Sequence, residues 1–246
     1  IEKEFEVFYK ASKDQTCHYI QCYTFTSVSN VNDGYTFTEL DGPREIALFT
    51  IGSSTYVIVV AQTDNGFQII DISTPSSPTS AGKCLDSTTV PYWADCDSTR
   101  LNNPLNVAVA TIGGTLYAVV TAYETTGAIS IFDISTPSDP TQVDEIVNSS
   151  GVVLWKPYGL AIAEFGGKTY AVVASTGNDG IAIIDISTPG SPTYVGEIED
   201  DADKELDYGR DIEVATINNL TYAFVAAFHD DALAVIDITD PTNPLY

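Results

Sequence analysis

Three segments of this chain have almost the same amino-acid sequence. Ile69–Thr79 reads IIDISTPSSPT, Ile131–Thr141 reads IFDISTPSDPT, and Ile183–Thr193 reads IIDISTPGSPT. A looser fourth copy, VIDITDPTNPL, occupies Val235–Leu245. In each copy an apolar run ends at an aspartate, and two prolines follow. Because proline fixes φ and lacks a backbone N–H, the segment after the aspartate is predicted to be a rigid turn.

A second sequence feature recurs at nearly the same spacing as this segment. A tyrosine opens an apolar run in each repeat, at steps of 61, 53 and 52 residues, and the aspartates recur at steps of 62, 52 and 52. Because the tyrosine and the aspartate recur at nearly equal intervals, the chain contains an internal repeat. The landmarks are Tyr56, Tyr117, Tyr170 and Tyr222, with Asp71, Asp133, Asp185 and Asp237.

Each repeat is predicted to form three inner strands and an outer fourth. A Gly or Asn pair, such as Gly113-Gly114 or Asn218-Asn219, lies before the tyrosine run and supplies the positive φ of a tight hairpin turn. The apolar runs are continuous rather than alternating, which indicates burial on both faces. Four antiparallel strands per repeat, without helical periodicity, predict an all-β fold of stacked sheets, as in a β-propeller.

The repeat resembles a known family. An opening Arg-Glu or Arg-Asp pair (Arg44-Glu45 and Arg210-Asp211), the tyrosine run, and the closing IIDIS with TPSSPT are similar to the LVIVD-type β-propeller repeat. The resemblance implies blades at about 43–103, 104–156, 157–208 and 209–246. Proteins of this type are mostly uncharacterised and secreted or on the cell surface. Here the repeats exceed the family's usual spacing, and the second and third lack the opening Arg.

Residues 1–42 share none of this wording, but EFEVFYKAS, CHYIQCYTFTSV and GYTFTEL are typical of three strands. Three roles are open for them: completing the last blade, adding a fifth blade, or pairing Ile1–Ser12 with a neighbouring subunit. The fourth repeat lacks an outer strand before Tyr246, so a longer parent chain with further blades or an anchor is also an open explanation.

The charge balance limits which classes of binding partner are expected. The chain has 34 acidic and 10 basic residues and a net charge of −24. Phosphate groups are bound by basic surfaces, so nucleic acid is excluded as an expected partner, and anionic membrane is disfavoured. No apolar run reaches the ~18 residues of a transmembrane helix. The expected partners are a protein or a glycan, including copies of the chain itself.

The cysteines and sequons predict an extracellular protein. Four cysteines allow three pairings, and the sequence-local one joins Cys17 to Cys22 and Cys84 to Cys96. None has the CxxC spacing of a zinc or redox site. An even number of cysteines in loops favours disulfides and an oxidising compartment. Glycosylation sequons begin at Asn148 and Asn219 and point to the same location.

Two sets of oxygen-bearing residues are candidates for calcium, the one cofactor that the sequence raises. The first strands open on Glu45, Asn106 and Asp211, which are expected near one mouth of a central channel. The loop before the fourth repeat contains Asp200, Asp201 and Asp203. In both cases the alternative is a solvated loop without an ion. The repeated aspartate of DIS is expected to be structural, since catalysis rarely repeats its group in every repeat.

Aromatic loop residues are the candidate ligand-binding set. The insert Lys83–Pro104 contains Tyr92 and Trp93 between two cysteines, and the equivalent loop one repeat later contains Trp155 and Tyr158. Aromatic side chains on adjacent loops can form a platform for a sugar or peptide, or else pack over the core. Arg44 and Arg210 complete the set, with ion pairs to Glu45 and Asp211 as their alternative role. His229 is expected to be a loop histidine without catalytic partners.

The sequence therefore favours a non-enzymatic extracellular recognition or structural module that binds a protein or glycan through loops at one propeller mouth. Two alternatives remain at this stage. One is a calcium-dependent, lactonase-like hydrolase that uses Glu45, Asn106 and Asp211. The other is a subunit of an extracellular filament that assembles through its N-terminal strands.

Overall fold

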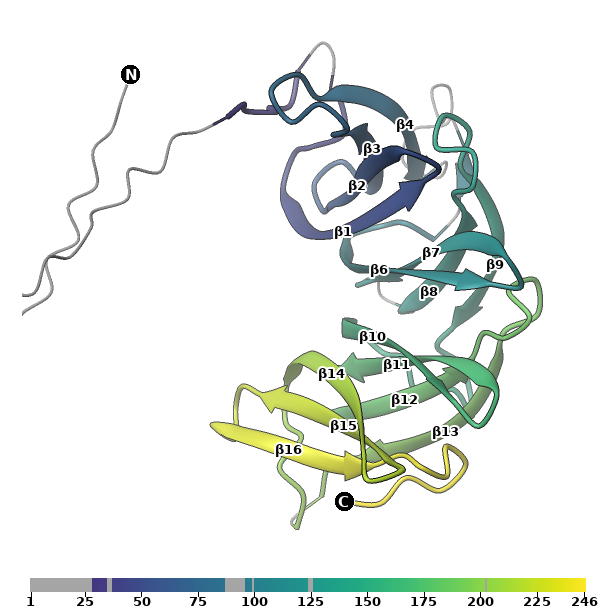
Figure 1. Cartoon of the computed structure of the whole chain (residues 1–246). Coiled ribbons are helices and arrows are strands. Elements are labelled where there is room, and N and C mark those ends of the chain that lie inside the picture. Colours follow the sequence, from purple (N-terminus) through teal and green to yellow (C-terminus); the bar gives the residue numbers. More distant parts are fainter. Residues whose placement is uncertain (1–27, 35–36, 87–95, 99, 124–125, 202) are drawn as a thin grey trace, which may run out of the picture.

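The computed structural model describes residues 28–34, 37–86, 96–98, 100–123, 126–201 and 203–246. The strands in this part of the chain form four sheets (Figure 1). The predicted all-β class is confirmed, and the sheets are the blades of a β-propeller fold. No helix in these residues is long and apolar enough to cross a membrane.

Each repeat forms one sheet. The first sheet contains β1 (Pro43–Ile51), β2 (Ser54–Ala61), β3 (Gly66–Asp71), β4 (Thr79–Asp86) and the short β5 (Asp97–Ser98). The second contains β6 (Pro104–Ile112), β7 (Thr115–Ala122), β8 (Ala128–Asp133) and β9 (Thr141–Val147). The third contains β10 (Pro157–Phe165), β11 (Lys168–Ser175), β12 (Gly180–Asp185) and β13 (Thr193–Glu199). The fourth contains β14 (Gly209–Ile217), β15 (Leu220–Ala227) and β16 (Ala232–Asp237).

The sheets differ from the expected four strands each at both ends of the series. The first sheet has five strands, because β5, from the cysteine-containing insert, pairs in parallel with β4. The fourth has three. There Asp237 and Leu245 form an isolated bridge, at the position where Asp185 and Thr193 begin the pairing of β12 with the outer strand β13.

The hairpin turns follow the sequence prediction. Asn218 and Asn219, between β14 and β15, have φ of 52° and 66°, and Gly113 and Gly114 have 60° and 86°. Both residues of such a two-residue turn need positive φ, which Gly adopts without strain and Asn tolerates. This turn chemistry therefore sets the register of the first two strands in the second, third and fourth sheets, whereas the turn of the first sheet has positive φ at Gly52 alone.

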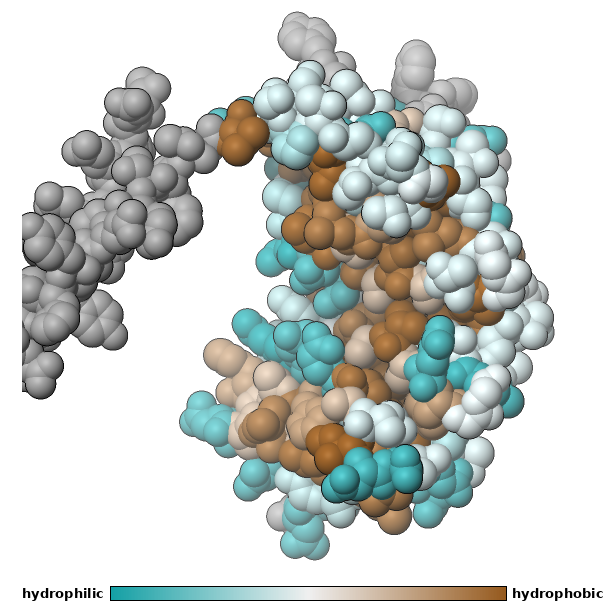
Figure 2. All heavy atoms as spheres, in the orientation of Figure 1, coloured by the Kyte–Doolittle hydropathy of each residue, from teal (hydrophilic) through white to brown (hydrophobic). Residues whose placement is uncertain are grey.

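The sheets stand side by side in an arc. The first strands, β1, β6, β10 and β14, contact their neighbours in sequence and line the inner side, whereas the outer strands β4, β9 and β13 lie on the outside (Figure 1). Among the described strands, the first and fourth sheets form the two ends of this arc (Figure 1). Apolar residues run along its inner side and onto the fourth sheet (Figure 2).

The core lies between adjacent sheets. Ile183 of β12 is fully buried against Ala234 and Ile236 of β16, and the same alternation repeats between the other neighbouring sheets. Successive residues of a strand point to opposite faces. The continuous apolar runs therefore fill two interfaces at once, as predicted.

The Asp-Ile-Ser segment, called DIS below (Asp-Ile-Thr in the fourth repeat), forms the same turn in every repeat. The carboxylate of Asp185 accepts a hydrogen bond from the Ser187 N–H at 2.9 Å, and the Ser187 hydroxyl oxygen accepts one from the Thr169 N–H at 3.0 Å. The same two bonds recur in the other sheets through Asp71 and Ser73, Asp133 and Ser135, and Asp237 and Thr239. The phrase thus ties the end of the third strand to the start of the second, which is a structural role.

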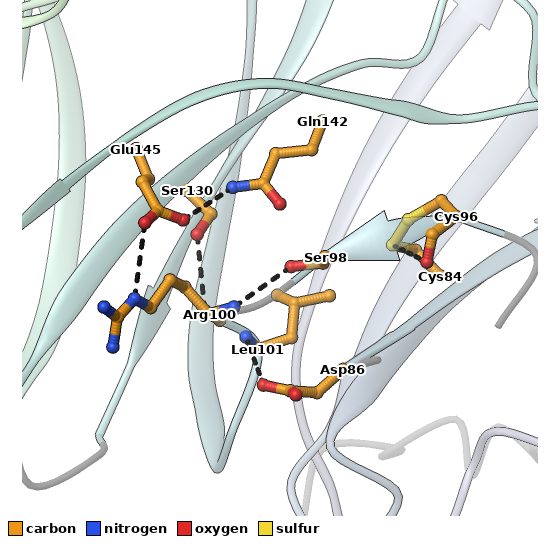
Figure 3. The surroundings of a disulfide bond; sticks show 9 residues. All are labelled: Cys84, Asp86, Cys96, Ser98, Arg100, Leu101, Ser130, Gln142 and Glu145. Atoms are coloured by element: carbon orange, nitrogen blue, oxygen red, sulfur yellow. Dashed lines mark hydrogen bonds and ion pairs between the residues drawn. A yellow bond between two sulfur atoms is a disulfide. The ribbon is translucent and has the colours of Figure 1, made fainter. Parts of the chain in front are cut away.

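The insert between the first two sheets is held by a disulfide. Cys84 and Cys96 are bonded, as the local pairing predicted, and the segment after Cys96 bridges the two sheets (Figure 3). Arg100 Nε lies 3.3 Å from Glu145 Oε1, and the Leu101 N–H donates to Asp86 Oδ2 at 3.0 Å. Cys17 and Cys22 lie outside the described residues.

Residues before the first repeat cover part of the first sheet. Val31, Phe37 and Leu40 pack on Val57, Val59 and Ile70, on the face turned away from the second sheet. The remaining N-terminal residues, 1–27, are not described, so the roles expected for their strands stay predictions.

Candidate functional site

Loops at one end of the sheets gather aromatic and basic side chains. We call this end the front rim; it comprises the loops before the first strands and the turns between the second and third strands. The back rim is the opposite end, which contains the DIS turns. On the front rim, eight residues from the second, third and fourth sheets form what we call the aromatic row: Tyr123, Trp155, Lys156, Tyr158, Tyr208, Arg210, Phe228 and His229.

The first half of the row is built around Lys156. Its ammonium lies 5.0 Å from the centre of the Trp155 ring and 5.6 Å from that of Tyr123. Tyr123 in turn meets Tyr158 edge to face, at 6.4 Å. The Trp155 ring packs on the backbone of Gly177, where any larger residue would collide with it, yet 42% of Trp155 is exposed.

The second half is built around Arg210. The guanidinium carbon lies 4.2 Å from the ring centre of Phe228, 5.1 Å from Tyr208 and 5.9 Å from Tyr158. His229 stacks on Tyr208 at 4.5 Å. Phe228 is 56% exposed, so its ring is accessible from solvent beside the Arg210 guanidinium. A cation held over ring faces presents N–H donors beside flat apolar surfaces.

Acidic side chains hold the loops of this rim in place. Asp179 Oδ1 accepts a hydrogen bond from the Tyr208 N–H at 3.1 Å, and Asp207 Oδ1 lies 3.2 Å from His229 Nδ1. Burial raises the pKa of the Asp179 carboxyl, and the nearby Asp207 charge adds to the rise, against the lowering effect of the Tyr208 hydrogen bond. The row therefore combines exposed rings, basic donors and acidic acceptors.

Two members of the row have an unfavourable backbone conformation. The residue before each first strand has positive φ: it is Gly42 in the first repeat and Asn103 in the second, but Lys156 (56°) and Tyr208 (58°) in the third and fourth. Residues other than Gly, Asn and Asp pay a steric penalty in this region. Such strain is common where a side chain serves a function.

The structure places the predicted ligand-binding residues as follows. Trp155, Tyr158 and Arg210 come together in the row, while Tyr92 and Trp93 lie outside the described residues. Arg44 donates to Gln62 on the first sheet and is not part of the row. Arg210 and Arg44 make no ion pair with Asp211 or Glu45 among the described contacts, so aromatic rings and an amide are their partners instead.

Sequence reasoning missed four members of the row, Tyr123, Lys156, Tyr208 and Phe228, and it did not foresee that His229 contacts Tyr208 and Phe228. A signal for them exists in the aligned repeats. Lys156 and Tyr208 occupy the position of Gly42 and Asn103, and Tyr123 and Phe228 follow the second strand where the first and third repeats have Gln62 and Thr176. Aromatic and basic residues at positions that are otherwise small or polar mark the rim.

The first candidate calcium set lies at the start of three first strands. Glu45, Asn106 and Asp211 each follow a bulge at the start of a first strand. Glu45 and Asp211 accept hydrogen bonds from the N–H groups of the next residues, at 3.0 Å each. At the corresponding place in β10, a Cβ on Gly159 would lie 2.9 Å from the Asp211 Cα, so only glycine fits there.

The second candidate set also serves its own loop. Asp200 accepts from the Leu206 N–H, and Asp201 accepts from the Asp203 N–H and pairs with Lys204. Across the described residues, no three or more His, Cys, Asp or Glu side chains are grouped to share an ion. Calcium at either set stays a prediction.

The two sequons lie on opposite rims. Asn219 is exposed in the back-rim turn between β14 and β15, far along the strands from Arg210. Asn148 follows β9 on the front rim, and its side-chain oxygen accepts from the Leu154 N–H at 2.9 Å. Their use stays a prediction.

The repeated sheets, their inner first strands and the DIS turns define a β-propeller repeat protein. Three segments, residues 55–86, 167–200 and 220–246, match the model of the LVIVD repeat. The chain therefore contains LVIVD repeats, in its first, third and fourth sheets, and the resemblance drawn from the sequence is confirmed. No curated protein matches the chain in sequence.

Solved structures share the fold at low identity. An α-L-arabinofuranosidase from Lactobacillus brevis is 15% identical with a TM-score of 0.53, over 85% of this chain and 74% of that chain. A thermostable family-43 glycoside hydrolase is 12% identical with a TM-score of 0.50, over 85% and 73%. A protein from Lactobacillus plantarum reaches 0.55 at 13% identity, over 82% and 55%. At these identities the likeness shows the fold alone.

Proposed function

We propose that this chain is a non-enzymatic extracellular recognition module that binds a glycan through the aromatic row. The observation that carries the proposal is the arrangement around Arg210, whose guanidinium lies over three rings while Phe228 stays exposed. Sugar rings present flat C–H faces that stack on aromatic rings, and their hydroxyls pair with Arg donors and Asp acceptors. A protein partner at the same rim is the alternative ligand.

The backbone supports a role beyond packing. Lys156 and Tyr208 adopt positive φ where Gly42 and Asn103 satisfy the same fold at lower cost. The fold therefore does not require these side chains, which favours a binding role for them.

Isothermal titration calorimetry with oligosaccharides tests the proposal. The probes are a neutral hexasaccharide and a hexasaccharide of uronic acids, whose carboxylates would pair with Arg210 and Lys156. Phe228→Ala and Trp155→Ala are expected to weaken binding of the preferred probe about tenfold or more, equivalent to ~1.4 kcal/mol. Leu220→Ala, at an exposed apolar residue of the back rim, is the control. Equal affinity in all variants, or no binding of either probe, would contradict the proposal.

The extracellular location rests on two features of the chain. A disulfide joins Cys84 and Cys96, and disulfides persist mainly in oxidising compartments. Asn219, in a sequon, is exposed on the rim opposite the aromatic row, so a glycan attached there leaves the row free.

The calcium-dependent hydrolase is the second candidate. The structural similarity to glycoside hydrolases concerns the fold alone, so it does not assign their activity to this chain. The residues proposed for the hydrolase lie at the start of the first strands of three sheets: Glu45, Asn106 and Asp211. An experiment in the Discussion tests whether they bind calcium. The filament alternative depends on the N-terminal strands, and residues 1–27 lie outside the described part of the chain.

A further inference from the structure

A cleft of about 530 Å³ opens on the back rim between the second and third sheets. It lies where the turn between β6 and β7 faces the hairpin of β10 and β11. Ile112 and Gly113 line it on the second sheet, and Glu164, Thr169 and Ser187 line it on the third. The aromatic row is at the other end of the same strands, so the two features are separate.

The side chain of Glu164 is directed toward the second sheet. Successive residues of a strand point to opposite faces, and Leu160 and Ile162 of β10 pack in the core between the second and third sheets. Glu164 follows them on the same face and lies opposite Thr169 of β11. Ile112 belongs to the same core from the other side. The cleft is therefore the back-rim end of the core that these two sheets share.

Glu164 departs from the pattern of the repeat. The other three first strands have a threonine at this position: Thr50, Thr111 and Thr216. In the fourth sheet, Thr216 and Thr221 share a hydrogen bond, with their hydroxyl oxygens 3.2 Å apart. The fold thus satisfies this pair of positions without a charged side chain, and the repeat does not require a glutamate here.

The corresponding oxygens of the third sheet are left without protein partners. Among the hydrogen bonds and ion pairs of the described residues, none involves the Glu164 carboxylate or the Thr169 hydroxyl, although Thr169 is only 9% exposed and buried hydroxyls usually have a partner. The Lys168 ammonium pairs with Asp185 Oδ2 at 2.6 Å. The Ser187 hydroxyl accepts from the Thr169 N–H at 3.0 Å and keeps a second lone pair for another donor.

We propose that this cleft binds a primary ammonium group carried on an unbranched carbon chain. An ammonium has three N–H donors and no acceptor, and the cleft offers three acceptor oxygens, one each from Glu164, Thr169 and Ser187. Ile112 provides an apolar wall for the carbon chain. The net charge of −24 attracts cations, whereas an anion would meet the unpaired carboxylate. A lysine side chain of a peptide and a free diamine both present this group.

An NMR titration of the isotope-labelled full chain in ~150 mM NaCl tests the proposal and separates the two sources. The probes are N-acetyl-lysine methylamide, for a peptide lysine, and cadaverine, for a free diamine. We expect saturable shifts of the Gly113 and Gly167 amides, which flank the cleft, with a Kd of about 1 mM, in the range for so small a ligand. The probe with the lower Kd identifies the source.

Three comparisons assign the binding to Glu164 and to its hydrogen bond. Glu164→Thr installs the residue of the other three repeats, so it is expected to fold and to raise the Kd at least ~tenfold. Glu213→Gln, which removes an exposed carboxylate of β14, is the matched control and should leave the Kd unchanged. The trimethylated lysine probe keeps its charge but has no N–H on the ammonium, so it should bind at least ~tenfold more weakly.

Three outcomes would overturn the proposal. Equal Kd values for the lysine probe and its trimethylated form would reduce the binding to charge attraction. An unchanged Kd in Glu164→Thr, with shifts at the front rim, would place the amine on the aromatic row, because ammonium groups also bind ring faces. No saturable shift with either probe would show that the cleft binds no amine.

This proposal and the glycan proposal can fail separately. Glu164→Thr is expected to leave oligosaccharide binding unchanged, and Phe228→Ala is expected to leave amine binding at the cleft unchanged, because the two residues lie on opposite rims.

Discussion

The positive-φ residue before each first strand shows how one backbone shape is met by different side chains. Its carbonyl accepts a hydrogen bond from the residue after the second strand: Gln62 to Gly42, Tyr123 to Asn103, Thr176 to Lys156 and Phe228 to Tyr208. The conformation thus joins two front-rim loops in every sheet. Where Lys156 and Tyr208 adopt it, the same bond also sets rings and cations side by side.

A matched pair of substitutions measures the strain at Lys156. Lys156→Gly and Lys156→Ala both remove the ammonium, so they differ only in the Cβ at φ 56°. We expect the Gly variant to have the higher free energy of unfolding, by ~1 kcal/mol, in urea denaturation. At Lys168, which starts β11 without positive φ, the order should reverse, because Gly is ~0.5–1 kcal/mol worse than Ala inside a strand. The same order at both sites would show that position 156 carries no strain.

Two aspartates are expected to give opposite pH dependences of stability. Burial acts to raise the pKa of Asp185, but hydrogen bonds from Lys168 and Ser187 outweigh it and lower that pKa. The Asp185 contribution is therefore present above the unfolded pKa, near 3.8, and is lost as pH falls through the folded value. For Asp179 burial raises the pKa, so ionisation at neutral pH costs stability in the folded state.

Urea denaturation of Asp185→Asn and Asp179→Asn between about pH 3 and 7 checks these signs. The loss of stability in Asp185→Asn should be largest at neutral pH and shrink toward pH 3. Asp179→Asn, which keeps an oxygen to accept the Tyr208 N–H, should gain relative to the wild type as pH rises over the same range. Parallel curves for the two variants would contradict the assignment.

At the scale of elements, the double-proline turn also joins neighbouring sheets. A Cβ on Gly82 in β4 would overlap the carbonyl of Pro137, which belongs to the turn of the next sheet. Gly196 in β13 meets Pro241 of the fourth sheet in the same way. The turn that closes one sheet therefore packs against the outer strand of the sheet before it, where a glycine permits the approach.

Gly196→Ala tests this contact. The added methyl would overlap backbone atoms that cannot rotate away, so we expect a loss of ~1–3 kcal/mol in the free energy of unfolding, as for other overpacked sites. Gly190→Ala, where the nearest atom is a Val143 methyl at 3.7 Å, is the control and should change stability little. Equal effects of the two substitutions in thermal or urea denaturation would remove the role assigned to the close approach.

The repeat could be read from the sequence because its signals are local. The Asn218-Asn219 turn, the DIS hydrogen bonds and the burial of continuous apolar runs all follow from residues adjacent in sequence. The aromatic row could be read only in part. Trp155 and Tyr158 were found as loop aromatics, but the contacts of Arg210 with Phe228 and Tyr208 depend on which loops share a rim, and this emerges only when the strands are paired.

At the scale of the whole molecule, stability is shared among the interfaces between neighbouring sheets. Each sheet contacts those before and after it in the series, an organisation typical of repeat proteins. Across these interfaces the contacts are apolar, while the net charge of −24 is distributed over the surface and opposes compaction.

Ionic strength should therefore stabilise the chain without regard to the identity of the cation. Raising NaCl from about 20 to 500 mM shortens the Debye length from ~20 to ~4 Å, which screens the repulsion among carboxylates and is expected to raise Tm. At matched ionic strength, MgCl2 and CaCl2 should give the same rise if no dedicated calcium site exists. The hydrolase alternative requires instead an additional rise with CaCl2 that Glu45→Gln and Asp211→Asn both abolish. That result would move the functional site from the aromatic row to the openings of the first strands.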